Sequence, residues 1–208
     1  MGVLRWVLAA VILLCARPAL ASSCDELVRS ARAHEASGEP ETALRQYTDA
    51  VGLDATCAAA WLGLGSLRAR MGDAAEAERV YDAALSHVPS LGEAALGRAR
   101  TRWALGRRDE AELDMQRYVE LASASDRLAA VRALEELAGW YRVIGRPPAE
   151  LACWRRVAAL APALDGALAS KARAMVAALE IAVAEADPVR HPPRSDLLRR
   201  VVAGLRGG

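Results

Sequence analysis

The chain has 208 residues with 27 basic and 26 acidic side chains, and its 53% hydrophobic content is too high for a disordered protein. Lys171 is the single lysine, Phe and Asn are absent, and the frequent Ala, Leu, Arg and Glu are strong helix formers, so the composition predicts an all-α protein. Residues 22–187 have 20 basic and 25 acidic side chains, and this acidic balance argues against binding to nucleic-acid phosphates.

Residues 1–21 have the pattern of a secretory signal peptide. Arg5 supplies a positive charge, residues 6–16 form an apolar run, and the small residues Ala19 and Ala21 suit a cleavage site. The run of about 11 residues is too short to cross a bilayer, which needs roughly 20. We therefore expect cleavage after Ala21 and export, with a periplasmic location.

Three cysteines remain after this cleavage, in a compartment that permits disulfides: Cys24, Cys57 and Cys153. An alternative for Cys24 is lipidation after cleavage at Ser23, which would anchor the protein to a membrane. Against lipidation, Ala21 stands where lipobox sequences usually have Leu.

Glycine and alanine recur at a spacing of 34 residues. The glycines are Gly38, Gly72 and Gly106, and the alanines five positions later are Ala43, Ala77 and Ala111. The second copy has the most complete pattern, with Trp61, Leu64, Gly65, Gly72, Ala77, Tyr81, Ala84 and Pro89. This order and spacing closely resemble the W-x2-L-G...A-x3-F...P pattern of the tetratricopeptide repeat family.

The resemblance implies a right-handed α-solenoid of about four helical hairpins. The repeat domain covers residues 22–162, and the copies lie at about 24–57, 58–91, 92–125 and 131–164. Glycines after each first helix suit a left-handed cap, and Gly145 takes this place in the fourth copy. In that copy Glu150 replaces the expected small Ala. We expect looser packing there, or a helix displaced by Pro147 and Pro148.

Residues 163–187 are predicted to form a helix that caps the last repeat. Its apolar stripe consists of Leu164, Leu168, Ala172, Met175, Leu179 and Ala182. Residues 188–208 form a basic, Pro-containing tail with a short amphipathic helix, whose apolar side chains are Leu197, Leu198, Val201, Val202 and Leu205. Three interpretations stay open for the tail: docking on the solenoid, contact with a partner or a membrane, or disorder.

No sequence motif for catalysis or cofactor binding is present, so we expect neither enzyme activity nor a cofactor. The three histidines are scattered and no CxxC motif occurs, so we also expect no metal site. His34 is interpreted as a half-buried structural residue. Neighbouring acids such as Asp25 and Glu26, or Glu135 and Glu136, point to different sides of a helix and are interpreted as solvated charges.

The family resemblance places a partner-binding groove on the first helices of the hairpins. The predicted groove residues are Arg32, Leu62, Arg70, Leu96, Arg100, Trp103, Arg132 and Arg142, and the inward positions also include Val28, Glu35, Ser66 and Glu135. Arginine binds carboxylates with two hydrogen bonds, so we expect an extended protein or peptide segment with acidic groups. The alternative is that these arginines only solvate a helix face. Members of the family that bind chaperone tails use asparagines, which this chain lacks, so that activity is not expected.

In the repeat register, Cys24 and Cys57 both fall at the start of a first helix. Packed helices lie about 8–10 Å apart by axis, whereas a disulfide needs Cα atoms within about 7 Å. Flexible helix starts would close this gap, so Cys24–Cys57 is a possible disulfide. This bond and lipidation of Cys24 exclude one another.

These features predict a non-catalytic module that binds a partner protein or peptide in the bacterial cell envelope. One alternative is a self-associating structural module, in which the basic tail docks on the acidic body of another copy. The other is a lipoprotein that assists assembly of an outer-membrane complex.

Overall fold

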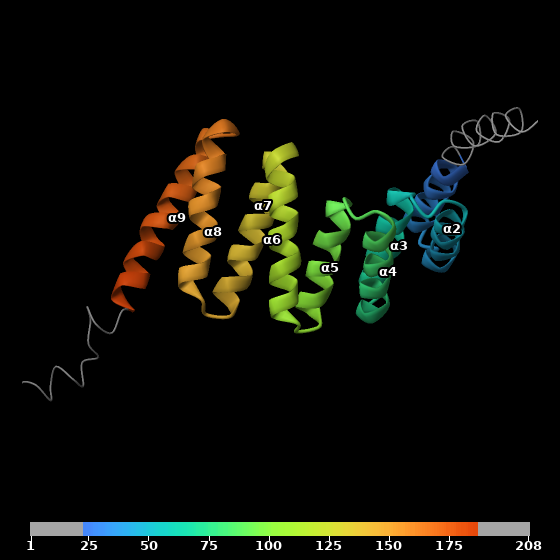
Figure 1. Ribbon diagram of the computed structural model, residues 1–208, viewed down its shortest axis with the longest axis horizontal. Coiled ribbons are helices and arrows are strands. Elements are labelled where there is room, and N and C mark those ends of the chain that lie inside the picture. The colour runs from blue at the N-terminus through green and yellow to red at the C-terminus, as the bar shows by residue number, and fades with distance from the viewer. Residues whose placement is uncertain (1–22, 187–208) are drawn as a thin grey trace, which may run out of the picture. The chain divides into compact units, whose positions relative to one another are not determined.

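The structure is a computed structural model that describes residues 23–186, and between these residues the chain is helical with short connections and no strand (Figure 1). The predicted all-α fold is confirmed. The predicted signal peptide, residues 1–21, and the predicted tail, residues 188–208, lie outside the described residues. None of the helices in the described range combines the length and apolarity needed to span a bilayer.

Consecutive helices pair into hairpins. The first described helix covers residues 23–36, and the next four are α2 (Pro40–Leu53), α3 (Ala58–Arg70), α4 (Ala74–His87) and α5 (Gly92–Ala104). They are followed by α6 (Arg108–Ser125), α7 (Arg127–Val143), α8 (Pro147–Leu160), the short 3-10 helix η1 (Ala161–Ala163) and α9 (Gly166–Glu185). The chain divides into two compact units, with the boundary between Tyr118 and Val119 inside α6, and each unit is described by itself.

A glycine in the left-handed region ends the first helix of each hairpin, as the repeat predicts. The φ angles are +76° at Gly38, +85° at Gly72, +79° at Gly106 and +68° at Gly145. This conformation is strained for residues with a Cβ. After Gly72, the amide of Asp73 donates to the carbonyl of Arg68 over 3.0 Å, and the Asp73 carboxylate accepts from the Glu76 amide over 3.2 Å. The glycine thus closes one helix and the aspartate starts the next.

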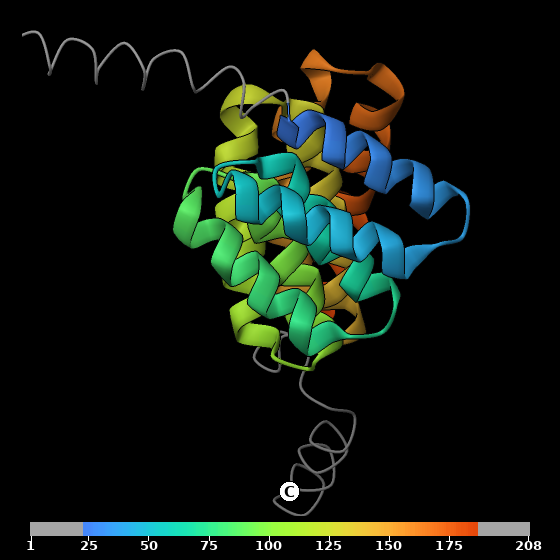
Figure 2. The ribbon, with the colours of Figure 1, turned by 90° about the vertical axis from the view of Figure 1, so that its right-hand side faces the viewer.

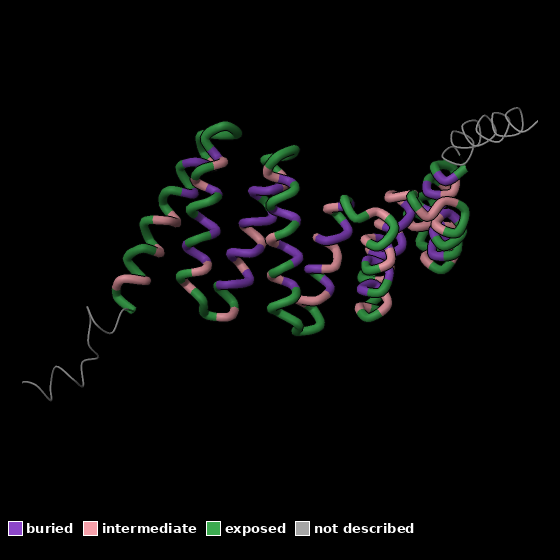
Figure 3. Tube along the Cα trace, viewed as in Figure 1, coloured by how far each residue is buried: buried purple, intermediate pink, exposed green. Residues whose placement is uncertain are grey.

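In the first unit, small and large residues interlock between the helices. Ala31 and Ala99 are fully buried, and so is Tyr47. Buried positions recur along every helix of this unit (Figure 3). Gly65 lies against the ring of Tyr81, where an added Cβ would lie 2.6 Å from the nearest ring atom. Figure 2 shows this unit from its N-terminal side, with the helix 23–36 in blue and α2 and α3 in cyan and teal.

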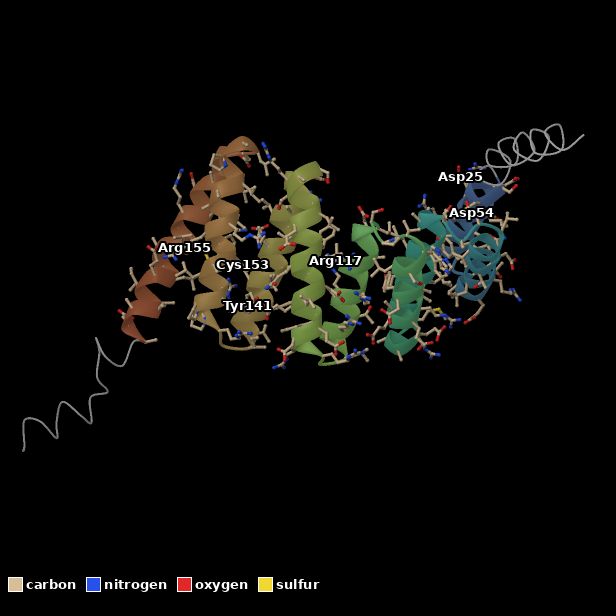
Figure 4. The ribbon with its side chains drawn as sticks, viewed as in Figure 1. Asp25, Asp54, Arg117, Tyr141, Cys153 and Arg155 are labelled. Carbon is tan, nitrogen blue, oxygen red and sulfur yellow. A yellow bond between two sulfur atoms is a disulfide. The ribbon has the colours of Figure 1, made fainter. Side chains whose placement is uncertain are left out.

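In the second unit, α7 and α9 both pack against α8. Tyr141 of α7 and Cys153 of α8 are labelled in Figure 4, and both are buried. Glu150 is also buried and sits within the first turns of α8, which begins at Pro147 as the sequence predicts. The guanidinium of Arg142 donates two hydrogen bonds to Glu150, from Nε over 2.8 Å and from a terminal nitrogen over 2.5 Å. A charged partner, and not looser packing, therefore accommodates the glutamate.

The predicted capping helix, residues 163–187, corresponds to α9, which follows the short helix η1. Asp165 caps α9 by accepting from the Ala167 amide over 2.9 Å. The predicted apolar stripe is covered only in part: Ala172 is buried, but Leu164 and Ala182 are exposed. Within the described residues, the main packing partners of α9 are α8 and η1, so part of the stripe stays uncovered.

Candidate binding groove

A groove of about 760 Å³ lies in the first unit, on the helix 23–36, α3 and α5. It is lined by five of the predicted groove residues, Arg32, Leu62, Arg70, Leu96 and Arg100. Glu35 and Ser66, two further inward positions predicted from the repeat, also line it. The structure thus brings together residues that are up to 68 positions apart in the sequence, because first helices of neighbouring repeats pack side by side, as α3 and α5 do.

Three predicted residues do not line this groove. Trp103 is half-buried, and the guanidinium carbon of Arg108 lies 5.5 Å from the centre of its ring. Arg132 and Arg142 belong to the second unit, where Arg132 is exposed and Arg142 binds Glu150. The interpretation of Val28 as an inward groove residue was wrong, since its side chain is part of the buried core.

Two glycines that the sequence reasoning missed form the floor of the groove. Gly63 lies against the ring of Tyr47, and Gly97 lies against the ring of Tyr81; an added Cβ at either position would overlap the ring. Tyr81 therefore touches glycines of both α3 and α5. Gly63 and Gly97 are 34 residues apart, so the repeat register contained the signal that would have identified them.

A hydrogen-bonded chain of side chains fixes one side of the groove. The hydroxyl of Tyr47 donates to Oε1 of Glu35 over 2.5 Å, and the other oxygen of Glu35 pairs with Arg70. Burial, and next the hydrogen bond to Glu35, raise the pKa of Tyr47 to about 12. Burial also raises the pKa of Tyr81, while the nearby charges of Arg100 and Arg70 oppose this rise. Both tyrosines are therefore protonated at neutral pH.

The groove has a formal charge of +1, since three arginines and two glutamates line it. Glu35 is engaged by Arg70, and the second glutamate is Glu93 on α5. Arg32 and Arg100 are both exposed at the surface of the groove. Guanidinium groups in this setting are suited to carboxylates and to backbone carbonyls of a bound chain.

The other side of α5 is held by a network of ion pairs that the sequence reasoning also missed. Arg98 donates to both oxygens of the buried Asp114 on α6, over 2.8 and 2.6 Å. Arg102 donates to Asp114 over 2.8 Å and to Glu78 of α4 over 2.8 Å. The hydrogen bonds from Arg98 to Asp114, together with its bond to Asp82, raise the pKa of Arg98 above its usual range, while burial opposes this rise. The network holds α5 in place while Arg100 lies on the groove.

A disulfide joins Cys24 to Cys57, with the Cα atoms 6.6 Å apart. Cys24 lies in the first turn of the helix 23–36, and Cys57 is the residue that precedes α3. Both helices contribute to the groove, through Arg32 and Leu62 respectively. The bond therefore ties two walls of the groove together at their starts.

Both histidines of the first unit have a side-chain partner. The ring of His34 is hydrogen-bonded to Glu39 over 2.8 Å, and His87 stacks on Trp61 with the ring centres 5.7 Å apart. Within residues 23–186 there is no group of three His, Cys, Asp or Glu side chains that could hold a metal ion. The groove instead offers arginines, an apolar strip and hydroxyl groups.

Comparison with known proteins gives a family match. A model of the tetratricopeptide repeat matches residues 28–90 and 65–126, and these segments include all residues that line the groove. A search of curated proteins gives no match.

Several solved structures have a similar fold. The first tetratricopeptide repeat of Spaghetti (RPAP3), bound to the HSP90 peptide SRMEEVD, is 22% identical with a TM-score of 0.53, covering 60% of this chain and 95% of that one. The crystal structure of MamA is 18% identical with a TM-score of 0.55, covering 68% and 78%. The Yersinia enterocolitica type III secretion translocator chaperone SycD is 22% identical with a TM-score of 0.52, covering 56% and 88%. At these identities, the likeness shows the fold.

Proposed function

We propose that the protein is a non-catalytic interaction module, because its groove lies within residues 28–126, which match a model of the tetratricopeptide repeat. It binds an extended segment of a partner protein that carries acidic groups. The observation that carries this proposal is the convergence of Arg32, Arg70 and Arg100 with Leu62 and Leu96 in one groove. A partner segment of this kind gains both charge-assisted hydrogen bonds and apolar contact.

The repeat arranges these side chains in two rows. Leu62 and Leu96 are 34 residues apart and form an apolar row, while Arg32, Ser66 and Arg100 share a second register and form a polar row. Neighbouring packed helices are about 8–10 Å apart, so Arg32 and Arg100 are separated by roughly 20 Å. About six extended residues span that distance. We therefore propose a ligand with two acidic groups about six residues apart and apolar side chains between them.

The similar structure of Spaghetti holds a short peptide, SRMEEVD, with three acidic residues. This supports an acidic, extended ligand for the present groove. The sequences are 22% identical, so we do not propose HSP90 itself as the partner. The chain contains no asparagine, which the carboxylate clamp of chaperone-tail binders uses, so we do not propose a chaperone tail as the ligand.

We further propose that the protein acts in the bacterial cell envelope after cleavage of residues 1–21. The signal-peptide pattern supports export, and a disulfide between Cys24 and Cys57 is compatible with an oxidising compartment. Because the Cys24 sulfur is used in that bond, we propose the cleaved form without a lipid. Intact mass of the protein from membranes and periplasm tests this: a chain that begins at Ser22 supports it, and a diacylglyceryl group on Cys24 contradicts it.

The ligand proposal is tested with an array of ten-residue peptides in which each acidic peptide has a copy with Gln and Asn in place of Glu and Asp. We expect acidic members to bind and their amide copies to bind at least about tenfold more weakly, since two charge-assisted hydrogen bonds are lost. Arg32→Ala and Arg100→Ala weaken the binding. The matched control is Arg29→Ala, which lies one turn earlier on the helix 23–36 and outside the groove. Equal binding of acidic and amide peptides, or equal losses in Arg29→Ala and Arg32→Ala, contradicts the proposal.

A further inference from the structure

The last described helix, α9, leaves much of its surface exposed. In the repeat register each of three α7 residues has a counterpart 34 positions later in α9: Leu134 with Leu168, Ala138 with Ala172, and Tyr141 with Met175. The α7 members are all buried. In α9 only the alanine is buried, and the two larger side chains are only half-buried. Equivalent positions of the repeat are therefore more exposed on α9 than on α7. Figure 3 shows fewer buried residues along α9 than along α7.

The uncovered part of α9 is apolar. Residues 174–184 contain ten apolar residues and one charged residue, Glu180. The carboxylate of Glu180 is bound by Arg155 of α8 over 2.8 Å, so it faces the neighbouring helix (Figure 4). Ile181, by contrast, is 61% exposed. A helix that ends a repeat array needs a polar outer face, and residues 174–184 do not provide one.

The sequence that follows α9 has the pattern of a matching helix. Leu197, Leu198, Val201, Val202 and Leu205 recur at the spacing of one helical face. Ser195 is a suitable residue to cap the start of such a helix. Residues 186–194, which contain Pro188, Pro192 and Pro193, are long enough to reverse the chain direction between the two helices.

We propose that residues 195–205 form a helix that packs antiparallel on the exposed apolar face of α9, as the second helix of a fifth hairpin. The apolar residues of the two helices face each other and leave the water. The charges also match, because residues 188–208 have five arginines and one aspartate, whereas Glu185 ends α9 and Asp187 follows it in the sequence. With this face covered, α9 has no apolar surface left for pairing with a second copy.

Hydrogen–deuterium exchange of the purified chain, compared with a chain that stops after Asp187, tests this packing. In the full chain we expect protected amides in residues 195–205. Removal of the tail accelerates exchange in residues 174–184 on the order of tenfold, while α7 keeps its protection and reports that the fold is intact. The truncated chain also binds a fluorescent apolar dye several-fold more strongly and gains mass in light scattering.

A pair of double variants tests whether the apolar face of the tail is required, or whether any two added charges have the same effect. Leu198→Asp with Val202→Asp places two charges on the apolar face and reproduces the effect of truncation. Ala203→Asp with Gly207→Asp places the same two charges away from this face, keeps all five arginines of the tail, and leaves exchange in α9 as in the parent. Three results overturn the proposal: unchanged exchange in α9 after truncation; tail protection that appears only together with a dimer mass; or tail protection that appears only with phosphatidylglycerol vesicles.

Discussion

Residues 23–118 and residues 119–186 use the same helical hairpin but stabilise it differently. The first unit has a disulfide, a network of arginines around the buried Asp114, and tyrosine rings seated on glycines. The second unit has apolar packing around Trp154 and single ion pairs such as Arg142–Glu150. Cross-links and charge networks are therefore concentrated in the unit that contains the groove.

The repeat register shows what this difference means for binding. In the fourth copy, 39 residues after the third, Glu135 stands where the groove has Leu96, Glu136 where it has Gly97, and Gly139 where it has Arg100. The packing positions keep their character, since Ala99 and its counterpart Ala138 are both fully buried. Hairpin packing and ligand binding thus depend on different positions of the same repeat.

The largest expected effect is the loss of Asp114. Asp114→Ala leaves the half-buried Arg98 and Arg102 without their shared carboxylate, and we expect the free energy of unfolding to fall by about 3–5 kcal/mol. Urea unfolding measures this loss. The control is Asp82→Ala, which removes a carboxylate that is 48% exposed from the same network and costs about 1 kcal/mol or less. Similar losses in both variants would show that the buried carboxylate has no special role.

Breaking the Cys24–Cys57 bond is expected to have the next largest effect. Reduction removes a cross-link over 33 residues and lowers the free energy of unfolding by about 2–4 kcal/mol. Thermal unfolding with and without a thiol-free reductant measures the change. Cys24→Ser with Cys57→Ser abolishes the response to reductant, whereas Cys153→Ser keeps it, because Cys153 is not part of the Cys24–Cys57 bond. A response that survives in the double serine variant would contradict the assignment.

Two glycine substitutions contrast the floor of the groove with the equivalent region of the fourth copy. Gly97→Ala forces the ring of Tyr81 to move and costs about 1–3 kcal/mol. Gly139→Ala meets no atom within 4 Å and stabilises its helix by up to about 1 kcal/mol. Chemical denaturation of both variants gives the sign of each change. Equal signs would mean that the contact with Tyr81 is not tight.

The smallest effect concerns alkaline pH. The pKa of Tyr47 is about 12 in the folded chain, above its ordinary value of 10.0. The folded state therefore keeps the hydroxyl proton to a higher pH than the unfolded state does. Its contribution is complete below pH 10 and is lost as the pH rises through 12. We expect Tyr47→Phe to show a smaller loss of stability than the parent between pH 10 and 12, as measured by urea unfolding at each pH. Parallel pH profiles would contradict this role of Tyr47.

The fold was predictable because its signals are local. Gly72 and Gly106 punctuate the chain at fixed spacing, and a left-handed turn after a helix depends only on nearby residues. Most of the groove was also predictable, because its residues occupy repeated positions on the first helices. Trp103 was assigned to the groove by its register alone, but at the end of α5 its ring packs near Arg108.

The ion pairs could not be predicted in the same way. Arg98 meets Asp114 across 16 residues and Arg102 meets Glu78 across 24, and each pairing depends on how two helices are rotated against each other. The composition offers 26 arginines and 26 acidic residues, so the sequence alone permits very many pairings. Likewise, nothing near Glu150 in the sequence indicates that Arg142 neutralises it.

Tyr81 touches Gly65 of α3 and Gly97 of α5, and Tyr47 connects α3 to the helix 23–36 through Gly63 and Glu35. Ring size therefore sets the distance between the helices that carry the binding side chains. Substitutions at Arg32 and Arg100 during evolution leave that distance unchanged. A protein built in this way can acquire a new partner through a few surface substitutions while its architecture stays the same.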